Sequence, residues 1–341
     1  MKMNFFVLIF SGLLLNLVTS QITPSASIGV NFGTLGDNLP YPQDVKNLYG
    51  RCKIQQMRLF EPNQDILEAL RNSGLSVCLG VVNNDIPGLS NFNDPQACID
   101  WLNTNVVPYK DDVTFKYITM GNEVIPGPLA QYVPAAINNM HNALNSLGLS
   151  KIMVTTVVPG NVLQTSYPPS AGAFSADSLP IMGDIISFLY GNGIPLMVNV
   201  YPYFSYAADP VSISLEYATF QSKTPVVVDG QFQYYNLFDA SVDAFHAAIE
   251  KVNAGNISVA ISETGWPTAG NDPYASKDNA QTYNTNLVNH VTNNGTPRRP
   301  GKIMYTFIFA MFNEDQKPQG VEQNFGLFYP NMDTVYPLFS C

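Results

Sequence analysis

Short apolar segments rich in β-branched residues alternate along this chain with longer stretches whose apolar residues recur at helical spacing. Near-continuous apolar runs of this length are typical of parallel strands that are buried on both faces. The pattern predicts eight strands, at about residues 27–32, 55–60, 76–82, 115–123, 151–158, 195–201, 257–263 and 302–312.

Helices are predicted after the first seven strands. Asp94-Pro-Gln is a helix start signal, and Gly74 is a residue that commonly follows a helix end. The longest interval without a core element follows the sixth strand, over residues 203–237, and is expected to hold a small subdomain. The predicted helices lie at about residues 43–49, 63–72, from 94 onward, 131–147, 179–190, 238–252 and 277–292.

This alternation, without a linker or a low-complexity segment, predicts a single (β/α)8 TIM barrel over residues 21–341 with a small excursion after strand six. A doubly wound open sheet is the alternative. Such a sheet normally carries a GxGxxG turn after its first strand, and Asn31-Phe-Gly-Thr-Leu-Gly lacks that spacing. The barrel is therefore favoured.

Residues 1–20 have the features of a signal peptide. Lys2 gives a positive start, the apolar run from Phe5 to Leu17 follows, and Val18-Thr-Ser precedes an expected cleavage before Gln21. The run is shorter than the ~20 residues that usually span a bilayer. No later segment is long and apolar enough to do so, and the chain ends without a hydrophobic tail. We expect an exported protein with no membrane anchor.

The composition favours a neutral polymer as ligand. Hydrophobic residues make up 46% of the chain, charged residues only 12%, and the net charge is −10. Nucleic-acid binding needs clustered Lys and Arg, and the longest basic run is the Arg298-Arg299 pair. Neither CxxC nor HExxH spacing occurs, so we predict no metal and no cofactor.

The cysteines and two sequons bear on processing. Cys78 lies in an apolar strand and is expected to be a buried thiol. Export permits disulfides, but a domain of this size does not need them, and no bridge is predicted among Cys52, Cys78, Cys98 and Cys341. Asn256-Ile-Ser and Asn294-Gly-Thr are candidate N-glycosylation sites.

Ionisable residues at strand ends indicate the chemistry, because catalytic side chains of barrels come from the carboxyl ends of strands. Glu123 ends strand four and Glu263 ends strand seven, after apolar residues in each case. Glycoside hydrolysis uses two such carboxyl groups, about 5 Å apart when the configuration is retained. A solvated carboxylate is the alternative for each residue; the pair together predicts a glycosidase site.

The strand-end motifs resemble the plant endo-1,3-β-glucanases of glycoside hydrolase family 17. Gly121-Asn-Glu and Ser262-Glu-Thr-Gly-Trp-Pro carry the resemblance at strands four and seven. It covers the whole mature chain. Further matching motifs are Ile28-Gly-Val-Asn-Phe-Gly, Met57-Arg-Leu-Phe-Glu-Pro-Asn, Val198-Asn-Val-Tyr-Pro-Tyr-Phe, Phe309-Ala-Met-Phe-Asn-Glu-Asp-Gln-Lys-Pro and Phe325-Gly-Leu-Phe.

The resemblance implies that Glu123 is the acid/base and Glu263 the nucleophile of a double-displacement reaction. Asn122 is then expected to bond the sugar 2-hydroxyl. One of Tyr201 and Tyr203 is expected to donate to Glu263. The other, together with Phe204 and Trp266, would offer flat surfaces for pyranose rings.

Two further sets of residues concern specificity. The family usually has Tyr and Asp where this chain has Phe60 and Glu61, which would remove one hydrogen bond to substrate and keep the stacking face. The cluster of Glu314, Lys317 and Glu322 follows strand eight. It would either act at the barrel mouth, with Lys317 near Glu123 or a sugar hydroxyl, or stabilise its loop by a salt bridge.

The expected function is a secreted retaining endo-β-1,3-glucanase acting on callose or fungal wall glucan, with a role in plant defence. One alternative is a 1,3-1,4-β-glucanase with the same catalytic pair, and another is a catalytically silent glucan-binding defence protein. A Ser-His-Asp esterase is disfavoured, because all three histidines lie on predicted helices and no GxSxG motif occurs.

The expected location is extracellular or in the cell wall. The sequence stops at Cys341, soon after the last predicted element, whereas vacuolar relatives carry an additional C-terminal propeptide. We also expect a monomer.

Overall fold

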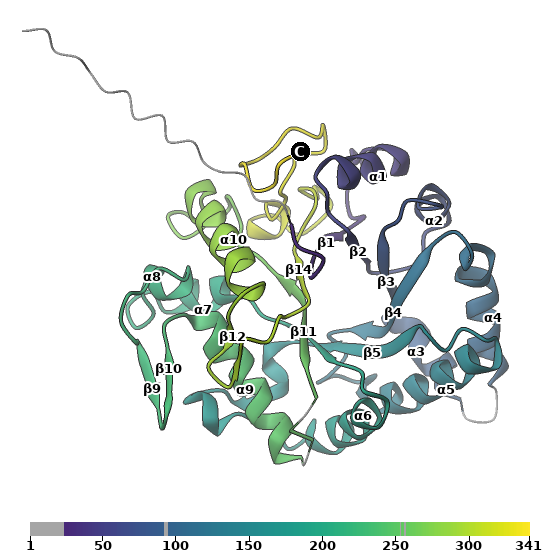
Figure 1. Cartoon of the computed structure of the whole chain (residues 1–341), viewed down its shortest axis with the longest axis horizontal. Helices are drawn as coiled ribbons and strands as arrows, with labels where there is room; N and C mark the ends of the chain where they lie inside the picture. The colour runs from purple at the N-terminus through teal and green to yellow at the C-terminus, as the bar shows by residue number, and fades with distance from the viewer. Residues whose placement is uncertain (1–23, 92–94, 253, 256) are drawn as a thin grey trace, which may run out of the picture.

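The computed structural model describes residues 24–91, 95–252, 254–255 and 257–341. Eight parallel strands form a closed barrel in the order β1-β2-β3-β4-β5-β8-β11-β14, and β1 pairs with β14 to close it (Figure 1). The predicted (β/α)8 barrel is confirmed. The strands are β1 (Ile28–Phe32), β2 (Gln56–Leu59), β3 (Ser76–Val81), β4 (Thr114–Asn122), β5 (Met153–Val158), β8 (Leu196–Asn199), β11 (Val259–Thr264) and β14 (Thr306–Ile308).

Helices surround the barrel, and several begin where a polar side chain caps them. Asn63, Asn236 and Ser276 each accept a hydrogen bond from a backbone N–H of the first helical turn. The helices are α1 (Pro42–Arg51), α2 (Gln64–Ala69), α3 (Ile86–Leu89), α4 (Gln96–Asn105), α5 (Val133–Ser146), α6 (Leu179–Asn192), α7 (Pro202–Ala208), α8 (Leu215–Ala218), α9 (Leu237–Lys251) and α10 (Lys277–Val291). All seven predicted helices are present.

The excursion after the sixth barrel strand is also present. It contains α7, α8 and the antiparallel hairpin of β9 (Val227–Asp229) and β10 (Phe232–Tyr234), which lies beside α9 in Figure 1. A second hairpin, of β6 (Leu163–Thr165) and β7 (Ala173–Phe174), follows β5 and was not predicted. Both hairpins follow carboxyl ends of barrel strands.

The inside of the barrel is filled by one side chain from each of six strands. These residues form an apolar cluster separate from the main core between strands and helices: Cys78, Tyr117, Val157, Met197, Ala260 and Phe307. Gly29 on β1 makes room for it, because a Cβ atom there would collide with the Phe307 ring. Cys78 is a buried thiol, as expected.

Two features of the last segment differ from expectation. The eighth strand is shorter than predicted: Ile303 is 64% exposed, and only Thr306–Ile308 pairs with both neighbouring strands. A disulfide joins Cys52 to Cys341, although no bridge was predicted. Sequence spacing could not show it, because the two cysteines are 289 residues apart and only barrel closure brings α1 next to the C-terminus.

Some expectations concern residues outside this description or are only partly addressed by it. The expected signal peptide and Asn256 lie outside the described residues. Asn294 is exposed in the turn before the short hairpin of β12 (Gly295–Thr296) and β13 (Arg299–Pro300). Within the described ranges, no helix is long and apolar enough to cross a membrane, and no cluster of potential metal ligands occurs.

Candidate active site

The backbone turns sharply where β4 ends. Gly121 and Glu123 both have left-handed φ angles, 77° and 56°. Glycine adopts this region freely, but a glutamate does so at an energetic cost that is characteristic of functional sites. Glu123 donates its backbone N–H to the Val157 carbonyl at 3.0 Å, which fixes the turn against β5. The glutamate side chain lines the cavity above the barrel.

Asn122 is held on both its backbone and its side chain. The amide side chain of Asn83 donates to the Asn122 carbonyl at 2.9 Å and accepts from the Asn122 N–H at 2.8 Å. The Asn122 Oδ1 accepts from Arg58 at 2.8 Å. The side-chain amide nitrogen of Asn122 therefore remains available to face a bound molecule.

Glu263 lies at the end of β11 with both carboxylate oxygens engaged. Oε1 accepts from the Arg58 guanidinium at 2.7 Å, and Oε2 accepts from the Tyr201 hydroxyl at 2.9 Å. Arg58 is 1% exposed and Glu263 is 7% exposed. Charged groups this deeply buried are stable only when paired and hydrogen-bonded, so the position of Glu263 is tightly defined.

Glu123 has a different environment. Its side chain opens into the cavity, and Oε1 accepts one hydrogen bond, from Asn199 Nδ2 at 2.7 Å. Desolvation by the cavity walls raises the pKa of Glu123, the Asn199 hydrogen bond opposes this, and the charge of Glu263 adds to the rise. A raised carboxyl pKa is what a general acid requires.

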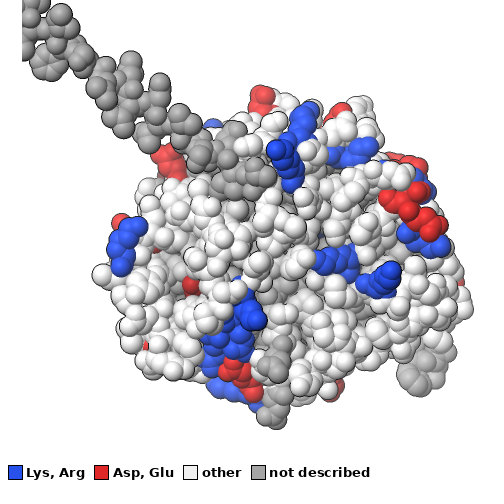
Figure 2. Space-filling view, viewed as in Figure 1, with Lys and Arg blue, Asp and Glu red and all other residues white. Residues whose placement is uncertain are grey.

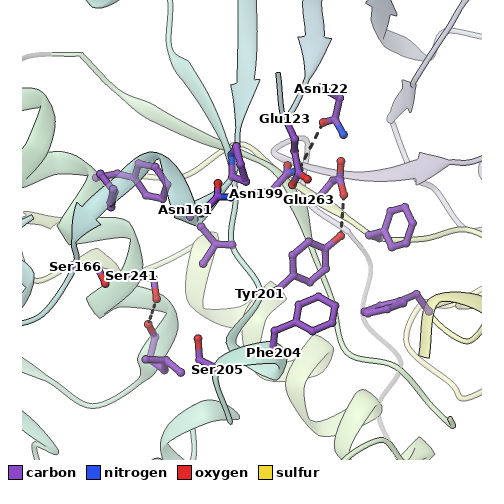
Figure 3. Close-up of a pocket in the computed structure, with 18 of the residues that line it drawn as sticks. Asn122, Glu123, Asn161, Ser166, Asn199, Tyr201, Phe204, Ser205, Ser241 and Glu263 are labelled. Atoms are coloured by element: carbon purple, nitrogen blue, oxygen red, sulfur yellow. Dashed lines mark hydrogen bonds between the residues drawn. The ribbon is translucent and has the colours of Figure 1, made fainter. Parts of the chain in front are cut away.

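The cavity that contains both glutamates has a volume of about 1280 Å³ and crosses the mouth of the barrel. One side is lined by residues that follow β1, β2 and β14, such as Leu35 and Glu314. The other side is lined by residues that follow β5 and β8, such as Asn161 and Phe204. In Figure 3, Glu123 and Glu263 lie next to each other, with the Tyr201 hydroxyl directed at Glu263.

A comparison with the sequence profiles of protein families shows the family of this chain. The profile of the Glycosyl hydrolases family 17 matches residues 28–339. The chain belongs to this family.

Several proteins are similar in sequence to this family 17 glycosyl hydrolase over nearly their full length. A glucan endo-1,3-beta-glucosidase from Vitis vinifera is 46% identical over 328 residues, covering 94% of each chain. Lichenase-2 from Hordeum vulgare is 43% identical, covering 92% of this chain and 98% of its own. The structure of CJP38, a beta-1,3-glucanase and allergen of Cryptomeria japonica pollen, is 43% identical with a TM-score of 0.87, covering 91% and 98%.

The aromatic residues expected around Glu123 and Glu263 divide into two groups in this hydrolase. Phe204 is 42% exposed and lines the cavity, and Tyr201 contacts Glu263 directly. Tyr203 and Trp266 are 1% and 0% exposed and do not line the cavity. Their rings pack against each other, with centroids 5.2 Å apart. These two side chains therefore pack behind the cavity wall and do not offer the expected flat surface to pyranose rings.

The polar atoms of these two side chains are hydrogen-bonded within the protein. The Tyr203 hydroxyl accepts from Asn271 at 3.0 Å, and the Trp266 indole N–H donates to the Tyr274 carbonyl at 2.9 Å. Sequence position at a strand end did not reveal this, because α7 begins at Pro202 and turns Tyr203 away from the barrel mouth.

Phe60 and the cluster after β14 all line the cavity of the hydrolase. Phe60 carries the Arg58 guanidinium over its ring at 4.4 Å. Glu314 is 2% exposed and accepts from the Leu35 N–H at 2.9 Å; its burial raises its pKa, and the hydrogen bond opposes the rise. Lys317 Nζ lies 5.2 Å from the Phe309 ring centroid. The loop-stabilising alternative, a salt bridge from Lys317 to Glu314 or Glu322, does not occur among the ion pairs of the described residues.

Three residues that hold Glu263, Asn122 or Glu123 in place were not assigned from the sequence: Arg58, Asn83 and Asn199. Arg58 and Asn199 each lie on a fully buried barrel strand, where a polar side chain needs a partner. That rule could have marked both positions as functional. Asn83 lies in a short 3-10 turn after β3 and carries no comparable signal.

Proposed function

We propose that this family 17 hydrolase is an endo-1,3-β-glucanase that cleaves 1,3-β-glucosidic linkages with retention of configuration. The observation that carries the proposal is the pairing of two glutamates in unlike environments at the ends of β4 and β11. Glu263 accepts from two fixed donors, whereas Glu123 has a raised pKa and a single donor. An acid and a nucleophile need this difference.

In the proposed first step, Glu123 transfers its proton to the glycosidic oxygen while a Glu263 oxygen attacks the anomeric carbon. The carbon–oxygen bond to the leaving chain breaks, and a glycosyl ester forms on Glu263. In the second step, water gives its proton to Glu123 and attacks the anomeric carbon, which releases Glu263. Tyr201 and Arg58 keep Glu263 aimed, and Asn122 offers an amide to the sugar 2-hydroxyl.

The shape of the cavity supports cleavage within a chain. It continues on both sides of the glutamates, toward Leu35 on one side and Tyr167 on the other. A polymer can therefore extend in both directions from the reaction centre. The low share of charged residues, 12% of the chain, supports a neutral substrate, and the face in Figure 2 is mainly uncharged, with charged side chains of both signs in scattered groups.

Time-resolved proton NMR of 1,3-β-glucan hydrolysis tests linkage and mechanism together. We expect oligosaccharide products whose new reducing ends first appear as the β-anomer, followed by slow mutarotation. An initial α-anomer would show that the reaction inverts configuration. Release of glucose alone from chain ends would show an exo-acting enzyme.

Glu263→Gln tests the catalytic assignment against a catalytically silent glucan-binding protein. We expect kcat to fall by at least about 1000-fold, because the amide cannot act as the nucleophile. Glu68→Gln is the matched control, since Glu68 is an exposed glutamate on α2. Equal hydrolysis by Glu263→Gln and wild type would refute the assignment.

A 1,3-1,4-β-glucanase is the second candidate, and the 43% identity to Lichenase-2 favours keeping it. The same catalytic pair would serve both reactions. Parallel assays on a pure 1,3-glucan and a mixed-linkage glucan separate them. We expect the higher kcat/KM on the pure 1,3-glucan.

We further propose that the hydrolase is a secreted monomer cleaved before Gln21. The Cys52–Cys341 disulfide supports export, because such bonds persist in oxidising compartments. N-terminal sequencing of the protein recovered from the medium of expressing plant cells checks the cleavage site.

A further inference from the structure

Ser262 precedes Glu263 on β11 and has contacts with three other barrel strands. It is 0% exposed and does not line the cavity, so it cannot touch a substrate. Its hydroxyl donates to Asn199 Oδ1, at the end of β8, at 2.7 Å. The Ser262 carbonyl accepts from Asn31 Nδ2 on β1 at 3.0 Å and from Arg58 on β2 at 3.2 Å. The position of the serine is therefore fixed on both its backbone and its side chain.

A bulge in β11 brings the serine hydroxyl to β8. Ile261 pairs with Val198, and Glu263 pairs with the next residue of β8, Asn199, so Ser262 has no partner in the register. An extra residue of this kind changes the direction of the side chains around it, and bulges are frequent beside active sites. Here Glu263 reaches the cavity, whereas the Ser262 hydroxyl reaches Asn199.

The side-chain amide of Asn199 has one orientation that satisfies its neighbours. Its oxygen accepts from Ser262, and its nitrogen donates to Glu123 Oε1 at 2.7 Å and lies 3.5 Å from Asn122 Oδ1 (Figure 3). A reversed amide would place its oxygen against Asn122 Oδ1, which already accepts from Arg58. The Ser262 hydroxyl would also lose its acceptor, and a buried donor without an acceptor is unfavourable.

The orientation of this amide decides which oxygen of Glu123 can carry a proton. An N–H group directed at Oε1 needs an acceptor there, so a proton on Glu123 lies on Oε2. Within the described residues, Oε2 has no hydrogen-bond partner, and the Glu123 side chain lines the cavity. Oε2 is therefore the oxygen that is free to give its proton to a glycosidic oxygen.

The Asn199 hydrogen bond also acts on the pKa of Glu123. Desolvation raises this pKa, and the hydrogen bond from Asn199 opposes the rise because it favours the ionised form. A reversed amide would accept the Glu123 proton and favour the neutral form. The other titratable groups that act on Glu123 come from four elements: Arg58 on β2, Tyr201 after β8, Glu263 on β11 and Glu322 in the 3-10 helix Val321–Gln323.

We propose that Ser262 is a positioning residue for the acid/base: by holding the Asn199 amide, it keeps the catalytic proton of Glu123 on Oε2. This inference rests on the proposed function, in which Glu123 is the acid. Without the Ser262 hydroxyl, the amide can reverse when Glu123 is protonated. The Glu123 proton is then hydrogen-bonded to Asn199 Oδ1 and turned away from the glycosidic oxygen.

Two substrates that differ in their need for an acid test the proposal. The leaving sugar of a 1,3-linked gluco-oligosaccharide must be protonated, whereas the phenolate of a dinitrophenyl β-glycoside of 1,3-linked glucobiose leaves without a proton. We expect Ser262→Ala to lower kcat/KM about 10-fold on the oligosaccharide and less than about twofold on the dinitrophenyl glycoside. Ser178→Ala is the matched control, with both values unchanged. Ser178 is 1% exposed, accepts from the Ser175 hydroxyl at 2.9 Å and does not line the cavity.

The pH profile of kcat/KM on the oligosaccharide gives a second readout. Its alkaline limb reports loss of the acid's proton in the free enzyme. A reversible amide raises the pKa of Glu123, so in Ser262→Ala this limb should move to higher pH, by up to about one unit. In an Asn199→Ala background, adding Ser262→Ala should change kcat/KM less than about twofold, because no amide is left to orient.

Three outcomes would overturn the proposal and leave the proposed function intact. They are an unchanged kcat/KM in Ser262→Ala, equal losses on the two substrates, and a full further loss in the Asn199→Ala background. Melting temperatures show that the variants are folded. If Ser262→Ala does not fold, Ser262→Cys fills a similar space with only a weak donor and takes its place. Failure of wild type to hydrolyse either 1,3-linked substrate would instead overturn the proposed function.

Discussion

Arg58 shows how one buried residue can order a whole site. Its guanidinium donates to Glu263, to the Asn122 side chain and to the Ser262 carbonyl. Only a planar fork of donors can reach three acceptors in fixed directions, whereas the Lys ammonium is a compact point charge. Arg58 is thus a positioning residue, since it acts through Glu263 and Asn122.

We predict that Arg58→Lys lowers kcat about 100-fold and changes KM much less. The charge stays, but Glu263 and Asn122 lose the orientation that Arg58 gives to both side chains. If Glu263 is the nucleophile, as proposed, misplacement by about 1 Å costs this much in rate. Steady-state kinetics on a soluble 1,3-glucan gives both constants. Arg71→Lys is the control, because Arg71 pairs with Glu68 and Asp112 at the surface.

A kcat for Arg58→Lys within threefold of wild type would contradict the positioning role. Circular dichroism of the variant would show that the barrel has folded. Loss of fold in Arg58→Lys, with no activity to measure, would make the residue chiefly structural.

At the scale of elements, α9 carries ionisable side chains on its buried face. Asp243 and His246 are 0% and 4% exposed. Burial raises the pKa of Asp243 to about 6, opposed by hydrogen bonds from Thr296 and Arg298. Burial lowers the pKa of His246 to about 4, and the charge of Arg299 lowers it further. Both residues are therefore held toward their neutral forms.

The two shifts act on stability in opposite directions. The folded state binds the Asp243 proton more tightly than the unfolded state does, so this group adds stability as the pH falls through about 6 toward 4. The folded state binds the His246 proton less tightly, so this group removes stability as the pH falls from about 6.5 toward 4. Each effect is on the order of 3 kcal/mol, and they largely cancel.

We predict that single substitutions expose each effect. Asp243→Asn should lose unfolding free energy on acidification from about pH 7 to 4, whereas His246→Asn should gain it. Denaturant unfolding at several pH values measures both slopes relative to wild type. If the unfolding free energy changed with pH in the same way in both variants, the two buried groups would not have opposite effects on stability.

Much of the fold and part of the site could be predicted from the sequence, for physical reasons that differ by residue. Strands and helices follow from local periodicity, and Glu123 and Glu263 follow from where strands end. The partners of those glutamates depend on contacts between strands far apart in sequence. Arg58 and Glu263 are separated by 205 residues, and the buried face of Tyr203 depends on the turn into α7.

The Cys52–Cys341 disulfide belongs to the whole molecule, because it links the first helix to the last residue of the chain. No α-helix follows β14: residues 309–341 form turns, isolated bridges and a short 3-10 helix. The disulfide anchors this segment, which also supplies Glu314, Lys317 and Phe325 to the cavity. A cross-link that closes so long a loop restricts the unfolded chain strongly.

We predict that replacing both cysteines by serine lowers the unfolding free energy by up to about 5 kcal/mol. Equilibrium unfolding in denaturant measures the loss. Reduced wild type should match the double variant, and the reductant should leave the double variant unchanged. Without the disulfide, residues 309–341 are also expected to open locally before the barrel strands do. Hydrogen exchange in residues 309–341 should therefore rise more than in β4 and β11. Equal protection of that segment with and without the disulfide would show that packing alone holds it against the barrel.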